Sequence, residues 1–125
     1  MDILSRMPVR DPDRFLPLKS DVLLILLVLA RRDRHGYGII RDVERRSGGE
    51  VRLATGALYR TLKRLLADGL ILESDRRAVD DDEERRRFYR ITPLGRAVVD
   101  AEVHRMSRLV RAARLIRAGK DPRLT

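Results

Sequence analysis

Apolar residues form separate blocks along the chain, and their spacing predicts the secondary structure. The longest block, residues 22–30, holds nine apolar residues in succession. It is too long and too rich in leucine for a typical strand, so we expect a helix buried on most sides, with Ser20 as its N-cap. A small domain rarely surrounds a helix completely. A partner subunit that covers one face of this helix would explain the pattern.

Two shorter helices are predicted next. From Tyr37 onward, apolar residues alternate with charged ones at a helical spacing, and the pair Gly48-Gly49 ends this helix. The following helix begins with Thr55 as its N-cap and stops at Gly69. Its inward face carries leucines at positions 58, 62, 65 and 66.

A hairpin and a long helix complete the pattern. Residues 70–74 and 85–91 read as two strands joined by a polar turn that contains the acidic run 80–84. Thr92 and Pro93 are typical of an N-cap and a first helical residue, so a helix is expected to run from there toward Gly119. Its apolar residues are spaced alternately by four and three, which favours a partner helix, although packing on its own domain is the alternative. This seam consists of Val99, Val103, Met106, Val110 and Ala113.

The order of elements predicts a mainly helical α+β fold, a winged helix-turn-helix. The second and third helices are short and follow each other closely, as in a helix-turn-helix, and the hairpin supplies the wing. Residues 18–92 would form this domain, residues 93–119 a C-terminal dimerisation helix and residues 120–125 a tail. Residues 1–17 contain three prolines, which exclude a long helix, so we expect an arm with at most one short turn; a disordered tail is the alternative.

Composition excludes several classes of protein. The 125 residues include no cysteine, so a disulfide framework, a zinc finger and a cysteine nucleophile are ruled out. His35 and His104 lie far apart in sequence, and no glycine-rich phosphate loop is present. We therefore expect no enzyme activity, metal or cofactor. No apolar run approaches the roughly 20 residues that span a bilayer, and Met1-Asp2 opens no signal peptide, so we expect a cytoplasmic protein without membrane contact.

The charge balance points to nucleic acid. The formal net charge is +9, and 25 of the 28 basic residues are arginine, which suits phosphate and guanine edges. In a helix-turn-helix the second helix enters the major groove, and here that helix carries no acid before Asp68. Arginines of the wing strand could reach the minor groove or nearby phosphates. The candidate DNA-binding residues are Thr55, Gly56, Tyr59, Arg60, Lys63, Arg64, Arg85, Arg86 and Arg87.

Several segments together resemble the PadR family of bacterial transcriptional regulators. They are residues 18–40 with the motif His-Gly-Tyr-Gly, residues 55–65, residues 68–71, and residues 87–95 with Phe-Tyr-Arg-Ile-Thr-Pro. The resemblance implies a winged helix-turn-helix, a homodimer built through the C-terminal helix, and a palindromic operator, usually for repression. Thr55, Gly56 and Tyr59 match the family's recognition helix, whereas Arg60 stands where many members have proline. Arg86 and Arg87 match its basic wing strand.

Two questions stay open at the level of sequence. A winged helix can serve as a protein-interaction module without specific DNA binding; such a module would show a neutral recognition face. A small-molecule effector is possible in an apolar pocket of a dimer, but the short C-terminal region, one helix here, differs from the longer domain of many family members. No residue identifies such a ligand, the operator sequence or the controlled genes.

Overall fold

The structure, a computed structural model, describes residues 11–74, 87–121 and 123. Three helices, a hairpin and a last helix follow one another in the predicted order. The elements are η1 (Pro12–Phe15), α2 (Ser20–Arg31), β1 (Arg34–His35), α3 (Gly36–Arg46), α4 (Thr55–Ala67), β2 (Ile71–Ser74), β3 (Phe88–Ile91) and α5 (Pro93–Arg117). The winged helix-turn-helix class is thus confirmed, with α3 and α4 as the helix pair and β2 and β3 as the wing.

The sheet has three antiparallel strands in the order β1-β3-β2. Ile71 faces Ile91 across β2 and β3, and Arg34 faces Tyr89 across β1 and β3. β1 is missing from the sequence prediction because a two-residue strand inside a polar segment has no periodicity of its own. The segment joining β2 to β3, including Arg85, Arg86 and the acidic run 80–84, lies outside the described residues.

The apolar helix α2 lies in the middle of the core. Its residues Leu23, Ile25, Leu26, Val28 and Leu29 are buried, and it packs against α3, α5 and β3. The chain itself therefore covers most of this helix, and the apolar pattern has an explanation within one protomer. Burying a Leu or Ile side chain contributes about 1.5–3 kcal/mol, so these contacts are a main source of stability.

Two of the predicted N-caps were wrong by one residue. The N-caps of α2 and α4 are Lys19 and Ala54, and neither cap uses a side-chain hydrogen bond. Ser20 and Thr55 are instead the first residues inside their helices. Thr92 does cap α5 as predicted, since its Oγ1 accepts the Gly95 N–H at 3.0 Å. α4 also ends as predicted, at Gly69 with φ +75°.

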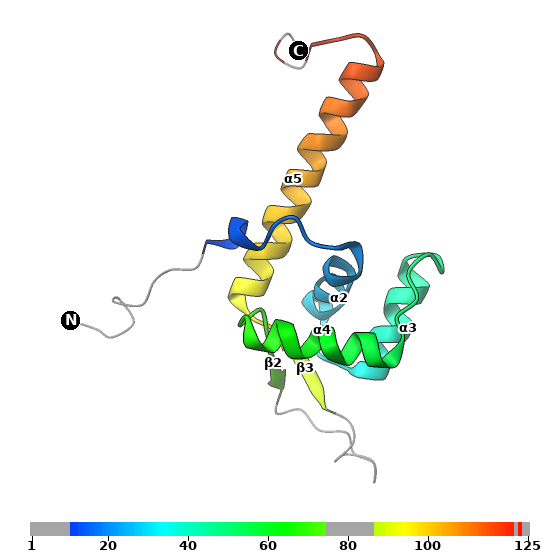
Figure 1. Cartoon of the computed structure of the whole chain (residues 1–125), viewed down its shortest axis with the longest axis vertical. Coiled ribbons are helices and arrows are strands. Elements are labelled where there is room, and N and C mark those ends of the chain that lie inside the picture. Colours follow the sequence, from blue (N-terminus) through cyan, green and yellow to red (C-terminus); the bar gives the residue numbers. More distant parts are fainter. Residues whose placement is uncertain (1–10, 75–86, 122, 124–125) are drawn as a thin grey trace, which may run out of the picture.

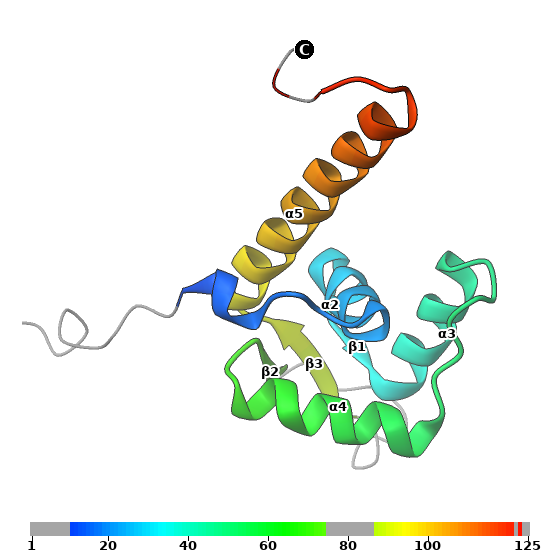
Figure 2. The same cartoon turned by 45° about the horizontal axis from the view of Figure 1, so that its top comes forward.

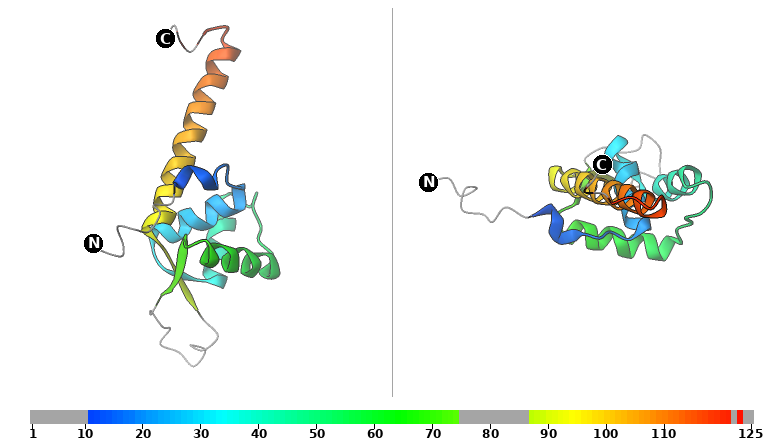
Figure 3. Two further views of the ribbon diagram at one scale, coloured as in Figure 1. Left: turned by 60° about the vertical axis from the view of Figure 1, so that its left-hand side comes forward. Right: turned by 90° about the horizontal axis from the view of Figure 1, so that it is seen from above.

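Helices α4 and α5 mark the two opposite ends of the molecule. α4 runs along one end, and the β2–β3 hairpin projects beyond it (Figure 1). α5 starts beside the sheet and rises away from α4, so that its second half extends beyond the other helices (Figure 2). The side view on the left of Figure 3 shows the same arrangement. The predicted DNA-binding helix α4 and the second half of the predicted dimerisation helix α5 therefore lie at opposite ends of the molecule.

A buried carboxylate joins the N-terminal segment to α5. Glu102 is fully buried, and its oxygens accept the Leu18 N–H at 2.6 Å and the Arg105 Nε at 2.5 Å. The hydrogen bond from Arg105, assisted by that from Leu18, lowers the pKa of Glu102 below its usual 4.5 although burial acts in the opposite direction. Glu102 lies on the core-facing side of α5, and its charge gave no sign in the sequence that it would be buried.

We expect Glu102→Gln to destabilise the protein near neutral pH by about 1–3 kcal/mol, because the variant loses charge-assisted hydrogen bonds. The pKa of Glu102 is lower in the folded state, so its contribution is present above the unfolded pKa and is lost as pH falls through the folded pKa. The difference between wild type and variant should therefore shrink below about pH 4.5. Urea unfolding at a series of pH values measures it.

Glu73→Gln is the matched control. Glu73 pairs with Arg87 at 3.3 Å on the surface, where an ion pair is worth at most about 1 kcal/mol. A pH-independent difference for Glu102→Gln, or an equal effect of both substitutions, would show that the buried carboxylate has no special role.

Candidate nucleic-acid interface

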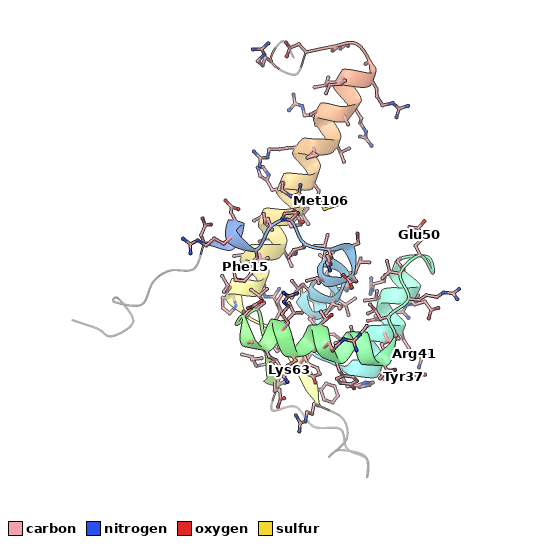
Figure 4. The ribbon with its side chains drawn as sticks, viewed as in Figure 1. Phe15, Tyr37, Arg41, Glu50, Lys63 and Met106 are labelled. Carbon is pink, nitrogen blue, oxygen red and sulfur yellow. The ribbon has the colours of Figure 1, made fainter. Side chains whose placement is uncertain are left out.

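The outward face of α4 is basic and polar. Leu58, Leu62 and Leu65 point into the core, which leaves the opposite side of the helix in solvent. The exposed residues from the sequence prediction on this helix are Thr55, Gly56, Tyr59, Arg60, Lys63 and Arg64. At about 100° per residue, Gly56, Arg60 and Lys63 share the centre of the exposed face. Figure 4 shows Lys63 on the side of α4 turned away from α2.

Tyr59 stands at the edge of this face, over the start of α3. Its side chain is 45% exposed, yet its hydroxyl reaches Gly36, where an added Cβ would lie 2.5 Å from that oxygen. A side chain at position 36 would therefore require the Tyr59 ring to move. This contact places the Tyr59 hydroxyl beside the basic residues of α4, and such a hydroxyl can donate a hydrogen bond to a phosphate oxygen.

Tyr37 and Arg41 extend the face onto α3, and the predicted set of site residues did not include them. Tyr37 is 64% exposed, and the Arg41 guanidinium lies 5.7 Å from the centre of its ring. Figure 4 places both beside the N-terminal end of α4. The helix that carries them begins with His35 as N-cap, its Nδ1 accepting the Gly38 N–H at 3.0 Å. The His-Gly-Tyr-Gly motif was the sequence signal for this start.

The wing contributes one described basic candidate, Arg87. Its Nη1 lies 3.3 Å from Glu73 Oε1, and both side chains are exposed, so this pair can open toward a phosphate at small cost. Burial, together with neighbouring Tyr59 and Glu73, raises the pKa of Tyr89 above 10, although Arg87 lowers it. The phenol of Tyr89, in β3 of the wing, therefore carries no negative charge near neutral pH.

Arg64 occupies the other edge of α4. Together with Arg60 it borders a groove of about 480 Å³ between α4 and the segment of residues 15–22. Both arginines thus border the N-terminal segment as well as the exposed face of α4. The structure thus brings Gly56, Arg60 and Lys63 together at the centre of the face, with Thr55 at the start of the helix and Tyr59 and Arg64 on either flank.

The five residues of the predicted α5 seam fall into two groups. Val99 is buried in the chain's own core, so its side chain packs inside the protomer. Val103, Met106, Val110 and Ala113 are exposed, and Leu109 and Ile116 are exposed apolar residues that the seam omitted. Met106 lies on α5 where the helix leaves the body (Figure 4). Val103, Met106 and Val110 also border a groove of about 590 Å³ with Leu23 of α2.

No helix among the described residues has both the length and the apolar composition needed to cross a bilayer. Within the same ranges, no three acidic or histidine side chains gather as a metal site requires.

Comparison with known proteins identifies the family. A family model described as "Transcriptional regulator PadR-like family" matches residues 25–101, which includes the helix pair, the wing and the start of α5. The chain belongs to this family. It is thus a DNA-binding transcriptional regulator and not an enzyme, and the PadR-like resemblance of the sequence is confirmed.

Two proteins match the PadR-like chain in sequence, and a third shares its fold. The chain is 38% identical over 89 residues to the transcriptional regulator Rv3488 of Mycobacterium tuberculosis, covering 71% of this chain and 78% of that protein. It is 37% identical over 87 residues to an uncharacterised 37.1 kDa protein in transposon TN4556 of Streptomyces fradiae; the match covers 70% of this chain but spans only 23% of that protein. A PadR family regulator of Clostridium difficile shares the fold, with a TM-score of 0.64, 22% identity, and coverage of 78% of this chain and 98% of that one.

Proposed function

We propose that this PadR-like protein is a homodimeric repressor that binds a palindromic operator, with one α4 helix in the major groove of each half-site. One observation carries the proposal. The basic face of α4 and the exposed apolar residues of α5 lie at opposite ends of the molecule (Figure 1), so both can be occupied at once. A dimer through α5 would leave both α4 helices free for DNA.

The residues of α4 suit different parts of the duplex. Arg60, at the centre of the face, has the fork geometry that pairs with guanine O6 and N7. Lys63 and Tyr59 suit phosphate oxygens, which position the protein without reading sequence. Thr55 and Gly56 begin the helix, where free backbone N–H groups favour a phosphate. Arg64, Arg87 just before β3, and the preceding Arg85 and Arg86 would hold the adjacent backbone.

The dimer is argued from apolar surface on α5. Val103, Met106 and Val110 are each between 43% and 47% exposed although they recur on one side of the helix. An antiparallel or parallel copy of α5 would cover these residues together with Ala113. To read two half-sites one turn of DNA apart, a two-fold dimer would hold its two α4 helices about 34 Å apart, and its operator would be palindromic. A dimer bound over a promoter would keep RNA polymerase from the DNA, and for this reason we propose repression.

Binding to a duplex from the gene's own upstream region, beside a scrambled duplex and across a salt series, tests the proposal. We expect selective binding whose log K falls steeply with log salt, since arginines displace counterions from phosphates. Weak and equal binding to both duplexes would contradict an operator in that region. No binding even at low salt would favour a protein-interaction module instead.

We expect Arg60→Ala to weaken operator binding by about 1–3 kcal/mol, because one bidentate base contact is worth that much. Binding to the scrambled duplex should change far less. Lys63→Ala is the matched control and should weaken binding to both duplexes alike, as removal of a phosphate partner does. Fluorescence anisotropy with both duplexes measures the split. An equal weakening on both duplexes for Arg60→Ala would make Arg60 a phosphate contact.

A further inference from the structure

A second basic surface lies where α2 ends and the outer side of α3 begins. Five arginines and one acid surround a hollow of about 230 Å³, here named the arginine hollow: Arg31, Arg32, Arg34, Asp42, Arg45 and Arg46. None of these residues belongs to α4 or to the wing. The function proposed above gives them no role.

The charges in the arginine hollow do not balance. Asp42, whose side chain is 8% exposed, is already paired with Arg34 and with Arg45, each at 2.5 Å. Arg31, Arg32 and Arg46 are exposed and have no acidic partner among the described residues. The Nε of Arg34 is buried and finds no acceptor in the described part of the chain. Like charges this close repel one another, and an anion in the hollow would relieve that repulsion.

The surface between the hollow and the recognition helix is continuous. An adjoining groove of about 530 Å³ shares Arg32, Arg34, Asp42 and Arg45 with the hollow and reaches His35, Tyr37 and Gly38 at the start of α3. Gly36, in the same turn, touches Tyr59 of α4. Along this surface Tyr37 therefore lies between α4 and the arginines.

We propose that the arginine hollow binds the phosphate backbone of DNA that flanks each half-site. Guanidinium groups match phosphate oxygens in pairs of hydrogen bonds, and several around one hollow suit a phosphodiester better than a single lysine would. The inference rests on the operator binding proposed above and extends its footprint. It predicts that DNA outside the bases read by α4 contributes to affinity.

The test compares two duplexes with the same operator, one ending at the half-sites and one longer by about a helical turn on each side. Wild type should bind the long duplex more tightly. The variant Arg31→Gln/Arg32→Gln/Arg46→Gln should lose most of that gain while keeping the wild-type affinity for the short duplex. On the long duplex, its slope of log K against log salt should become shallower by about 0.9 for each phosphate that the variant no longer neutralises.

The matched control is Arg14→Gln/Arg108→Gln/Lys120→Gln, which removes the same charge from exposed positions on η1, on α5 and after α5. It should keep the gain from flanking DNA. The inference is overturned if wild type gains nothing from the longer duplex, if the hollow variant keeps the gain, or if the control loses as much. Failure of wild type to prefer the operator over scrambled DNA would instead overturn the proposed function itself.

Discussion

The double substitution Val103→Glu/Val110→Glu should convert the protein to monomers and weaken operator binding by at least about 100-fold. Both side chains are exposed in the protomer, 44% and 47%, so glutamate there is hydrated and the fold survives. In a dimer the same carboxylates would be buried against apolar residues without partners, which costs several kcal/mol. A monomer holds one half-site only and loses the gain in affinity from binding two sites together.

Sedimentation velocity measures the first effect and anisotropy with the operator duplex the second. Arg108→Glu is the control. It also changes the charge by two units on α5, but at about 100° per residue it lies on the opposite side of the helix from Val110. It should leave the dimer intact. A double variant that still sediments as a dimer would place the interface elsewhere.

The elements of this fold could be predicted because each has a local signal. These signals depend only on residues close by in sequence. They are the apolar run of α2, the glycines after α3 and α4, and the Thr92-Pro93 start of α5. The predicted N-caps Ser20 and Thr55 were wrong. A hydroxyl residue indicates that a helix starts nearby, whereas the exact N-cap residue depends on the direction from which the preceding segment approaches the helix.

The candidate site was predictable in its charge but not in its geometry. The order of elements together with an acid-free second helix of the helix-turn-helix was sufficient to select α4. The contact of Tyr59 with Gly36 joins two helices, and the cluster around Asp42 joins the end of α2, β1 and α3. Neither the contact nor the cluster produces a periodic pattern in the sequence, so neither could be predicted from it. Val99 continued the spacing of the α5 seam, yet it lies in the first part of that helix, which packs on the core.

Gly95→Ala should destabilise the protein by about 1–3 kcal/mol or more, a typical cost of overpacking against a rigid neighbour. An added Cβ would collide with the Leu70 carbonyl oxygen and lie 2.7 Å from the Ile91 side chain. The Leu70 carbonyl cannot turn away, because it accepts the Thr92 N–H at 3.0 Å, and Thr92 Oγ1 also donates to the Gly69 carbonyl at 2.7 Å. The first turn of α5 would have to shift.

This junction also sets the direction in which α5 leaves the body, and hence where the two α4 helices of a dimer lie relative to each other. We therefore expect Gly95→Ala to weaken operator binding even at temperatures where the variant stays folded.

Gly56→Ala, in the first turn of α4, is the control for stability. Its Cβ would lie 3.4 Å from Arg60 Nη1, which is an ordinary contact. Because alanine has the higher helix propensity, this substitution should stabilise the protein by up to about 1 kcal/mol. Urea unfolding at one fixed protomer concentration compares the two, since dimerisation makes stability depend on concentration. Effects of the same sign would mean that the Leu70 carbonyl does yield, and that Gly95 is not required for the path of α5.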